Sequence, residues 1–592
     1  MTMLLERTGA EDTDGGRADD DREAVAAGST GTGARTTPKR RPSPGARPRP
    51  GRPAGRPRPL PVAHRVLTGP APAAPALTPK PPHRHQQRRP VPHRPTTVAS
   101  PTPPESLREW LPRTWQWSTF LVVATLATIG LHLWRVSTSY DLFIDEPFYA
   151  QVGQSIARGG MPFATGSPFF LHPPGFFLVE AAWMHLFGGH TSVFASVFSL
   201  RKLVGVVAGL TALMLGLLVA KVAGRAAAVL VVLGYLFSAF ANDQSSMVLL
   251  EPITLFWTIA GYTVFAHLDQ DDGPRRRRQV LAGALLFGIA CLSKEFAVFV
   301  TLLPLGIAFV TRTWLTRREA VRAVVVTCVP WGVWLVVVAV NGYWSQFFAQ
   351  ITSGYHRTTG STQISGFNTK NAPSFLDTIL ANLGQLWTAY TVLGIGTFAI
   401  GYVFWTSKDR PRLRFLSLFG VGAVPLLAYC VLLGTNEEQF FNFLFFPALI
   451  CLVIAVRANW RRIGRTLRVA LLVLVAAAAL SDTAVYLDLH LGSDNGTYLV
   501  DRWMYQHVPD GTAVGTTNPV QREIFLRYAM VDDAPGKHLG PHVQYLVVFD
   551  KQVDQGYAFV DHATVARQTR NKPIVFETTD RSNGRMVIYA LH

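Results

Sequence analysis

Cysteine is scarce in this sequence, and its spacing is unsuited to cross-linking. The chain has four cysteines, each inside an apolar segment and none in a C-x-x-C pair: Cys291, Cys328, Cys430 and Cys451. A disulfide framework or a thiolate metal site needs cysteines that are paired in the sequence or in conserved spacings. We therefore interpret the four as small buried apolar residues.

Motifs that bind nucleotides are also missing. The chain contains no G-x-x-x-x-G-K-[ST] loop, no convincing Rossmann turn and no H-E-x-x-H pair. Such loops cradle phosphates with backbone amides, and the paired histidines of H-E-x-x-H bind zinc. The sequence therefore gives no sign of a nucleotide-linked substrate or of a zinc-peptidase site.

Charged residues make up only 16% of the 592 residues, whereas 48% are apolar. This balance indicates a polytopic α-helical membrane protein rather than several soluble domains. The first long apolar run, residues 115–136, is long enough to cross a hydrocarbon core of about 30 Å. It begins too late for a cleaved signal peptide, so we expect it to be a retained first span.

Acidic residues are absent from residues 35–94, which contain fifteen Lys and Arg in a Pro-rich and Gly-rich context. This segment holds most of the formal net charge of +18. It has too little apolar surface to fold, so we predict that residues 1–113 form a disordered cytoplasmic tail. Loose attraction to anionic membrane lipids is the favoured role. Nucleic-acid binding is disfavoured, because no aromatic residues alternate with the arginines to stack on bases.

Basic clusters recur after every second apolar run, and such clusters favour the cytoplasmic side. They lie at residues 221–225, 275–278, 311–322, 407–414 and 457–468. This spacing predicts about eleven spans in a transmembrane domain, 114–486, with a cytoplasmic N-terminus and an external loop, 137–202. The predicted spans are 115–136, 203–220, 226–241, 250–267, 279–293, 296–311, 323–341, 385–405, 415–433, 440–456 and 468–486.

Two segments of the external loop are predicted to be interfacial helices. Residues 173–188 are short for a span and include Glu180 and His185, which favours a position on the membrane surface. In the segment that follows Glu146, Tyr149 and other apolar residues recur at helical spacing. Residues 487–592 have a different character, with three strand-like runs and a helix over 518–530. They predict a small extracytoplasmic α/β domain.

Paired acids stand at the start of the external loop, in "YDLFIDEPFYAQVGQSIARGG". Asp145 and Glu146 share the predicted outer face with His172, Asp243 and Glu251. A carboxylate there can accept the proton of an attacking hydroxyl, while cations hold a phosphate that leaves with negative charge. A sugar linked to a lipid phosphate suits this placement, because the membrane delivers it.

Lys294 lies between two short predicted spans and should sit below the outer surface. Ionisable groups at that depth usually line a cavity, which would place Lys294 in the site. The alternative is a lysine that extends to the interface and pairs locally with Glu295.

The sequence resembles the GT-C glycosyltransferases that use polyprenyl-phosphate sugars, in particular protein O-mannosyltransferases and lipid A aminoarabinose transferases. The resemblance rests on "DEPFYAQVGQSIARGG", the later "HPPGFFL" and the acid Glu251. It implies that Asp145 is the catalytic base, that Glu146 and Glu251 shape its surroundings, and that Tyr149 lines the pocket.

Two departures from the aminoarabinose transferases bear on the substrate. Phe148 stands where they have an arginine, and Leu171-His172 replaces their Glu-Lys. Aminoarabinose is therefore disfavoured as the sugar. Contact with the carrier phosphate is expected from His172, Lys294, His356 and Arg357.

The expected function is an inverting hexosyl- or pentosyltransferase of the plasma membrane, with a glycan, lipid or protein of the cell envelope as acceptor. A transporter or flippase of lipid-linked sugars is the alternative, although it would bury charges near the bilayer midplane, often in two related halves. Cofactor use stays open. A divalent cation could bind Asp145, Glu146, His172 and Asp243, although no tight ligand spacing supports a metal site.

The first prediction concerns the tail. Deleting residues 1–105 should leave folding and transfer nearly intact, because a disordered cytoplasmic arm cannot reach an external site. Turnover of the purified, membrane-inserted truncated protein checks this, and a collapse of its activity would contradict it.

Overall fold

The computed structural model describes most of the chain after the basic tail. The tail, 1–113, and its predicted disorder lie outside the described residues. The described residues are 114–143, 145–164, 166–188, 192–358, 375–432, 438–517, 520–532, 539–554, 558 and 560–592.

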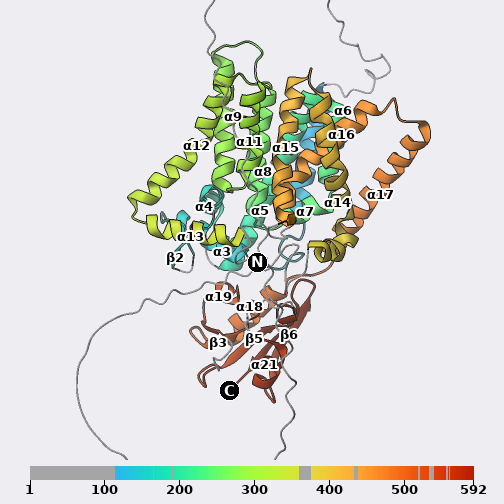
Figure 1. Cartoon of the computed structure of the whole chain (residues 1–592). Coiled ribbons are helices and arrows are strands. Elements are labelled where there is room, and N and C mark those ends of the chain that lie inside the picture. Colours follow the sequence, from blue (N-terminus) through green and yellow to red (C-terminus); the bar gives the residue numbers. More distant parts are fainter. Residues whose placement is uncertain are drawn as a thin grey trace, which may run out of the picture. The chain divides into compact units, whose positions relative to one another are not determined.

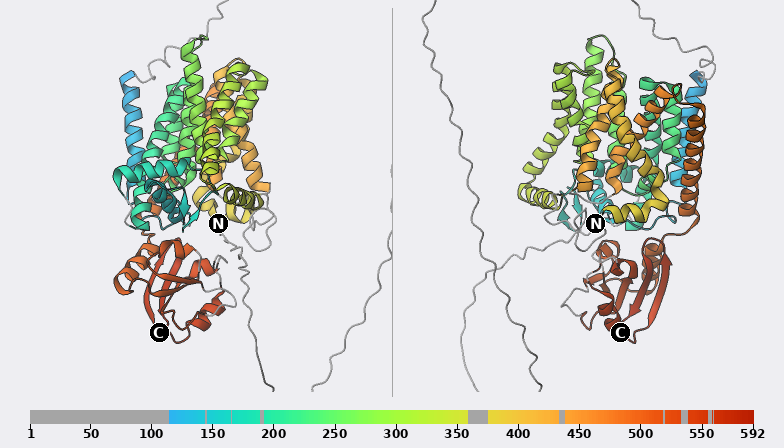
Figure 2. Two further views of the ribbon diagram at one scale, coloured as in Figure 1. Left: turned by 90° about the vertical axis from the view of Figure 1, so that its left-hand side faces the viewer. Right: turned by 45° about the vertical axis from the view of Figure 1, so that its right-hand side comes forward.

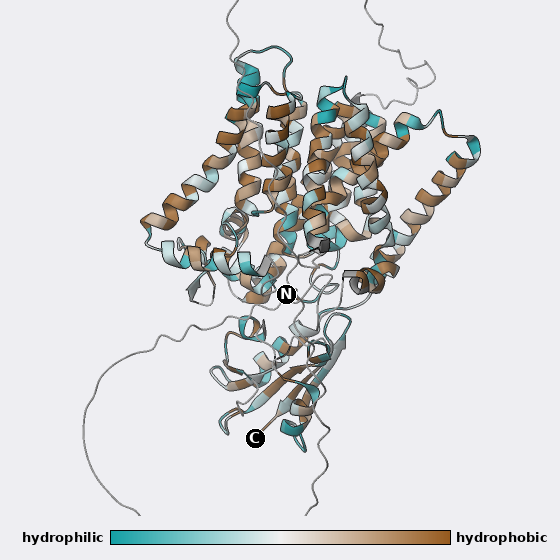
Figure 3. Ribbon diagram, in the orientation of Figure 1, coloured by the Kyte–Doolittle hydropathy of each residue, from teal (hydrophilic) through white to brown (hydrophobic). Residues whose placement is uncertain are grey.

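Long apolar helices form the first part of the fold (Figures 1 and 2). Figure 3 shows that most of their length is hydrophobic, as lipid-facing and core-facing helices require. They are α2 (Thr114–Leu133), α5 (Val193–Ala223), α6 (Arg225–Leu236), α8 (Leu250–Ala266), α9 (Pro274–Ser293), α10 (Ala297–Val300), α11 (Leu302–Thr311), α12 (Arg317–Val340), α14 (Phe375–Thr406), α15 (Pro411–Leu432), α16 (Asn442–Asn459) and α17 (Arg465–Leu491).

Every predicted span coincides with one of these helices, and α10 and α11 together fill the place of one. Seven helices of the described chain are long and apolar enough to cross a membrane: α2, α5, α12, α14, α15, α16 and α17. The polytopic helical architecture is confirmed. The number of eleven spans stays a prediction, because α6, α8 and the α10–α11 pair are short, and arginines occupy the first turn of α9.

Local sequence signals explain where several helices begin. Thr316 and Glu319 form a capping box at the start of α12, and the Ser192 side chain accepts a hydrogen bond from the Ala195 amide at the start of α5. Within the bundle, glycines permit close helix contacts. A Cβ atom at Gly422 of α15 would collide with the carbonyl oxygen of Phe299 in α10.

Two short helices follow the first long one at the predicted positions, α3 (Glu146–Ala157) and α4 (Gly175–Phe187), with the strand pair β1 (Phe163–Ala164) and β2 (Ser167–Pro168) between them. They pack against each other. Gly153 of α3 lies against the buried Glu180 side chain of α4, whereas His185 is exposed. Glu180 therefore faces the other helix rather than solvent.

A helix also forms where a loop was expected. The predicted spans 323–341 and 385–405 leave residues 342–384 as a long external loop, but α13 (Trp344–Thr358) occupies its first part. Trp344, Phe347, Phe348 and Ile351 recur at the three- and four-residue spacing of one helical face. Phe347 is buried against Phe170, which precedes α4.

The chain ends in a mixed five-stranded sheet with strand order β4-β3-β5-β7-β6. The strands β3 and β4, and β3 and β5, run parallel, whereas β7 runs antiparallel to both neighbours. The elements are α18 (Gly496–His507), β3 (Ala513–Thr516), α19 (Val520–Ile524), β4 (Ala529–Asp532), β5 (Tyr545–Phe549), α20 (Asp550–Asp554), α21 (His562–Gln568), β6 (Ile574–Asp580) and β7 (Gly584–Ala590).

The three strand-like runs predicted in this region are β5, β6 and β7. The helix predicted over 518–530 is only partly correct, because α19 ends at Ile524 and the residues from Ala529 onward pair with β3. The core of the sheet domain includes Phe194 from the first turn of α5, and Leu142 packs against it. The chain segment before α3 is therefore in contact with the sheet domain.

Candidate active site

Asp145 lies immediately before the first turn of α3. Pro147 is at the start of this helix, where its fixed φ and missing amide are well tolerated. The Asp145 side chain is buried, and the Tyr149 hydroxyl, one turn further on, donates a 3.3 Å hydrogen bond to its Oδ2. The positive end of the helix dipole favours an ionised carboxylate at this position.

Glu146 has different surroundings from its neighbour. Its carboxylate is completely buried and forms an ion pair with Arg201 of α5, with Nε to Oε1 at 2.8 Å and Nη2 to Oε2 at 2.5 Å. The amides of Phe143 and Val248 each donate a further 2.8 Å hydrogen bond to it. All its strong acceptor positions are therefore used within the protein.

Arg201 also holds the chain segment that leads into α3. Its Nη1 donates to the carbonyl oxygens of Val136 and Tyr140, and its Nη2 donates to that of Asp141. The guanidinium is fully buried. The sequence interpretation missed this residue, although an arginine about two turns inside a long apolar helix is itself a signal, since a buried charge needs partners.

Aromatic rings surround the Tyr149 side chain. His172 and Phe176 meet its ring in edge-on contacts, with centroids 6.1 and 5.7 Å away. The His172 Nδ1 lies 3.5 Å from Oε2 of Glu295. The structure therefore brings together Asp145, Tyr149 and His172, as the sequence predicts.

Lys294 forms an ion pair with Glu251, and both side chains are almost completely buried. Of the two alternatives for Lys294, the structure favours the buried position, with Glu251 as its ion-pair partner, while the neighbouring Glu295 lies beside His172. The extended backbone of Lys294 after the end of α9 directs these consecutive side chains to different partners. The Lys294 Nζ also lies 4.7 Å from the centre of the Phe440 ring.

The remaining predicted residues are less central. His356 is exposed on α13, and the side chain of Arg357 lies outside the described part of the chain. Asp243 lies in the short helix α7 (Ala239–Gln244) and is only partly exposed. Among the described residues, no three His, Cys, Asp or Glu side chains group as metal ligands. Because Arg201 already binds Glu146, the four residues considered for a cation do not form a ready site.

The fold has known relatives among solved structures. ArnT from Cupriavidus metallidurans bound to undecaprenyl phosphate superposes with a TM-score of 0.54 at 14% identity, over 81% of this chain and 99% of that one. The apo oligosaccharyltransferase of Archaeoglobus fulgidus gives a TM-score of 0.51 at 13% identity, over 81% and 75% of the two chains. The chain has the GT-C glycosyltransferase fold.

A sequence comparison supports the same assignment for the middle of the chain. Residues 181–351 match the family model of dolichyl-phosphate-mannose-protein mannosyltransferase. The match includes Glu251 and Lys294 but begins after Asp145 and Glu146. A search of curated protein sequences found no match. The resemblance to GT-C enzymes drawn from the sequence is thereby confirmed for the fold.

The ion pair between Arg201 and Glu146 yields a stability prediction. Arg201→Met should destabilise the folded protein by about 3–5 kcal/mol, because it leaves a buried carboxylate without its countercharge. The double variant Arg201→Met, Glu146→Gln should recover part of the loss, since the remaining amide is neutral. Thermal unfolding of the single and double variants in detergent measures the coupling. Strictly additive losses would show that the two residues do not act as a pair.

Proposed function

We propose that this GT-C protein is an inverting glycosyltransferase of the plasma membrane. It moves a hexose or pentose from a polyprenyl-phosphate donor to a hydroxyl group of a cell-envelope glycan, lipid or protein. The reaction takes place on the outer face, with the N-terminus in the cytoplasm and residues 487–592 outside. The observation that carries the proposal is that the two adjacent acids, Asp145 and Glu146, have different contacts.

These contacts indicate a different role for each acid. Glu146 is committed to Arg201 and two backbone amides, so it is occupied as a structural anchor. Asp145, held by the same turn, has its carboxylate beside the hydroxyl of Tyr149. A base must stand within hydrogen-bond reach of the proton that it removes, and a short side chain at a fixed helix start is suited to that task.

The chemical step needs little beyond a base and phosphate contacts. Asp145 takes the proton from the acceptor hydroxyl while the hydroxyl oxygen attacks the anomeric carbon of the donor. The bond from that carbon to the phosphate oxygen breaks, and the lipid phosphate leaves with both electrons. One displacement from the face opposite the leaving group inverts the anomeric configuration.

His172 and Lys294 are the groups proposed to contact the leaving phosphate. Lys294 pairs with Glu251, and His172 lies beside Glu295. Because Lys294 and Glu295 are consecutive residues after the end of α9, the two proposed phosphate contacts are tied to the same part of the chain. Preorganised cations stabilise charge that develops on a leaving group. The undecaprenyl phosphate bound to ArnT supports a donor of this class.

The acceptor is less defined by these contacts. The Archaeoglobus fulgidus oligosaccharyltransferase was also solved tethered to an acceptor peptide, with a TM-score of 0.51 to this chain. That likeness supports a peptide or protein among the acceptors considered, and we propose that the sheet domain supplies a surface for it. Exposed His356 on α13 is proposed to contact the substrate from the side of the bundle, together with Arg357.

The assignment of the base is tested by two isosteric variants. Asp145→Asn should lower turnover by about 100-fold or more while donor affinity is kept, because the amide cannot accept the proton. Glu146→Gln should cost less turnover per folded molecule and act mainly on stability. Single-turnover transfer from a radiolabelled lipid-linked sugar in proteoliposomes, with donor binding measured separately, distinguishes the two.

Two results would overturn the proposal. Near-normal turnover of Asp145→Asn would remove Asp145 as the base. Movement of the lipid-linked sugar across the bilayer without any new glycosidic product would favour the transporter alternative.

A further inference from the structure

The segment between α2 and α3, residues 134–145, is bound on one side by the sheet domain. Asp141 carries most of this contact. Its Oδ2 accepts hydrogen bonds from the Thr497 amide at 3.1 Å, from the Thr497 hydroxyl at 2.6 Å and from the Asn583 side-chain amide. Only 6% of Asp141 is exposed, so water does not replace these partners readily.

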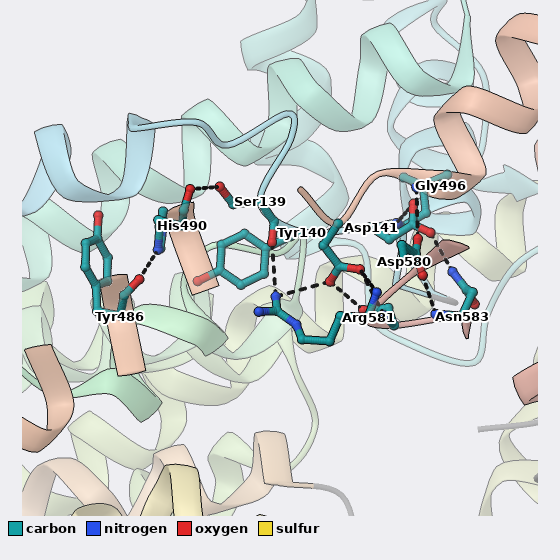
Figure 4. Close-up of polar contacts among 12 residues, drawn as sticks. Ser139, Tyr140, Asp141, Tyr486, His490, Gly496, Asp580, Arg581 and Asn583 are labelled. Atoms are coloured by element: carbon teal, nitrogen blue, oxygen red, sulfur yellow. Dashed lines mark hydrogen bonds and ion pairs between the residues drawn. The ribbon is translucent and has the colours of Figure 1, made fainter. Parts of the chain in front are cut away.

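A second carboxylate, Asp580 at the end of β6, lies beside Asp141 (Figure 4). It accepts hydrogen bonds from the Gly496 amide at 2.8 Å and from the Asn583 amide at 2.7 Å. Nearby, Arg581 donates to the carbonyl oxygen of Ser139, and the Asp494 amide donates to that of Thr138. The sheet domain thus forms hydrogen bonds with three of the four residues 138–141: Thr138, Ser139 and Asp141.

The other side of the same segment is bound by the helical bundle. The Asp141 carbonyl accepts a 2.7 Å hydrogen bond from Arg201, whose guanidinium also holds Glu146. The Leu142 amide folds back onto Asp141 Oδ1 at 2.9 Å. Asp145 follows Asp141 by only four positions, so a displacement of residues 138–141 also moves the turn that holds Asp145 and Glu146.

We propose that Asp141 is a positioning residue, through which the sheet domain holds Asp145 in the geometry required for transfer. This inference rests on the proposed function. The contact between the sheet domain and residues 138–141, here called the junction, can nevertheless be probed without a substrate. It gives the sheet domain a role in positioning Asp145, in addition to any contact with the acceptor.

The electrostatics of the junction make its stability depend on pH. Burial and the neighbouring Asp580 raise the pKa of Asp141 from 3.8 to about 8, so Asp141 binds a proton at neutral pH. Because the folded-state pKa is raised, stability falls as the pH rises between these values, and the junction is weakest above a pH of about 8. The other charged and titratable groups on the elements around Asp141 include Arg201, Glu146, Arg135, Arg581, Asp494 and His490.

Hydrogen exchange of the full chain in nanodiscs tests the junction directly. At pH 7, Asp141→Ala should speed amide exchange over residues 138–146 by about tenfold or more, because the local opening becomes easier. Asp141→Asn should stay near the wild type, because the neutral amide can donate to Asp580. The matched control is Asp554→Asn, an exposed carboxylate of the same domain that pairs with His562. At pH 9 the wild type should exchange faster than Asp141→Asn.

Transfer kinetics separate positioning from general stability. Asp141→Ala should lower kcat by about 10- to 100-fold with an almost unchanged KM for the donor, since small misplacements of a base are costly. Unchanged exchange over residues 138–146 in Asp141→Ala would overturn the proposal. If that variant does not fold, unchanged exchange over residues 138–146 in Thr497→Val, which lacks the hydroxyl that donates to Asp141, would overturn it. A wild-type protein without transfer activity would instead contradict the proposed function.

Discussion

The buried ion pair between Arg201 and Glu146 is the interaction on which the arrangement of the site depends. Arg201 is held within a long apolar helix, and it donates to the Glu146 carboxylate and to three carbonyl groups of the segment before α3. Removing one partner of a buried pair leaves an uncompensated charge, which costs about 3–5 kcal/mol. The start of α3, and with it Asp145, is therefore fixed to the bundle by this guanidinium together with the Val248 amide.

This constraint accounts for two adjacent acids with different tasks. Glu146 is neutralised in place and contributes a rigid turn, whereas the neighbouring Asp145 is placed beside Tyr149. The sheet domain holds the same turn from its other side through Asp141. In the proposed mechanism, the position of the base thus depends both on the bundle and on a domain about four hundred residues away in the sequence, a separation that only the tertiary fold can bridge.

Much of this was accessible from the sequence, because it depends on local patterns. Apolar run lengths predicted the long helices, and the helical spacing of apolar residues after Glu146 predicted α3. Long-range partners were not accessible. Nothing in the sequence pairs Arg201 with Glu146 or Lys294 with Glu251, since such pairs are decided by which helices pack together.

The errors have similar causes. Local composition suggested a loop after α12, but the apolar face of α13 gains stability by packing Phe347 on Phe170. The helix predicted over 518–530 does not continue to its predicted end, because the backbone from Ala529 onward forms its hydrogen bonds with β3 instead. In both places tertiary contact outweighs local propensity.

The most direct test of the account is a structure of the full chain with a non-transferable polyprenyl-phosphate sugar analogue. The account predicts the anomeric carbon near the Asp145 carboxylate, the phosphate near His172 and Lys294, and the pair between Arg201 and Glu146 intact. A donor phosphate bound by Arg201 after release of Glu146, or a sugar positioned away from Asp145, would contradict it.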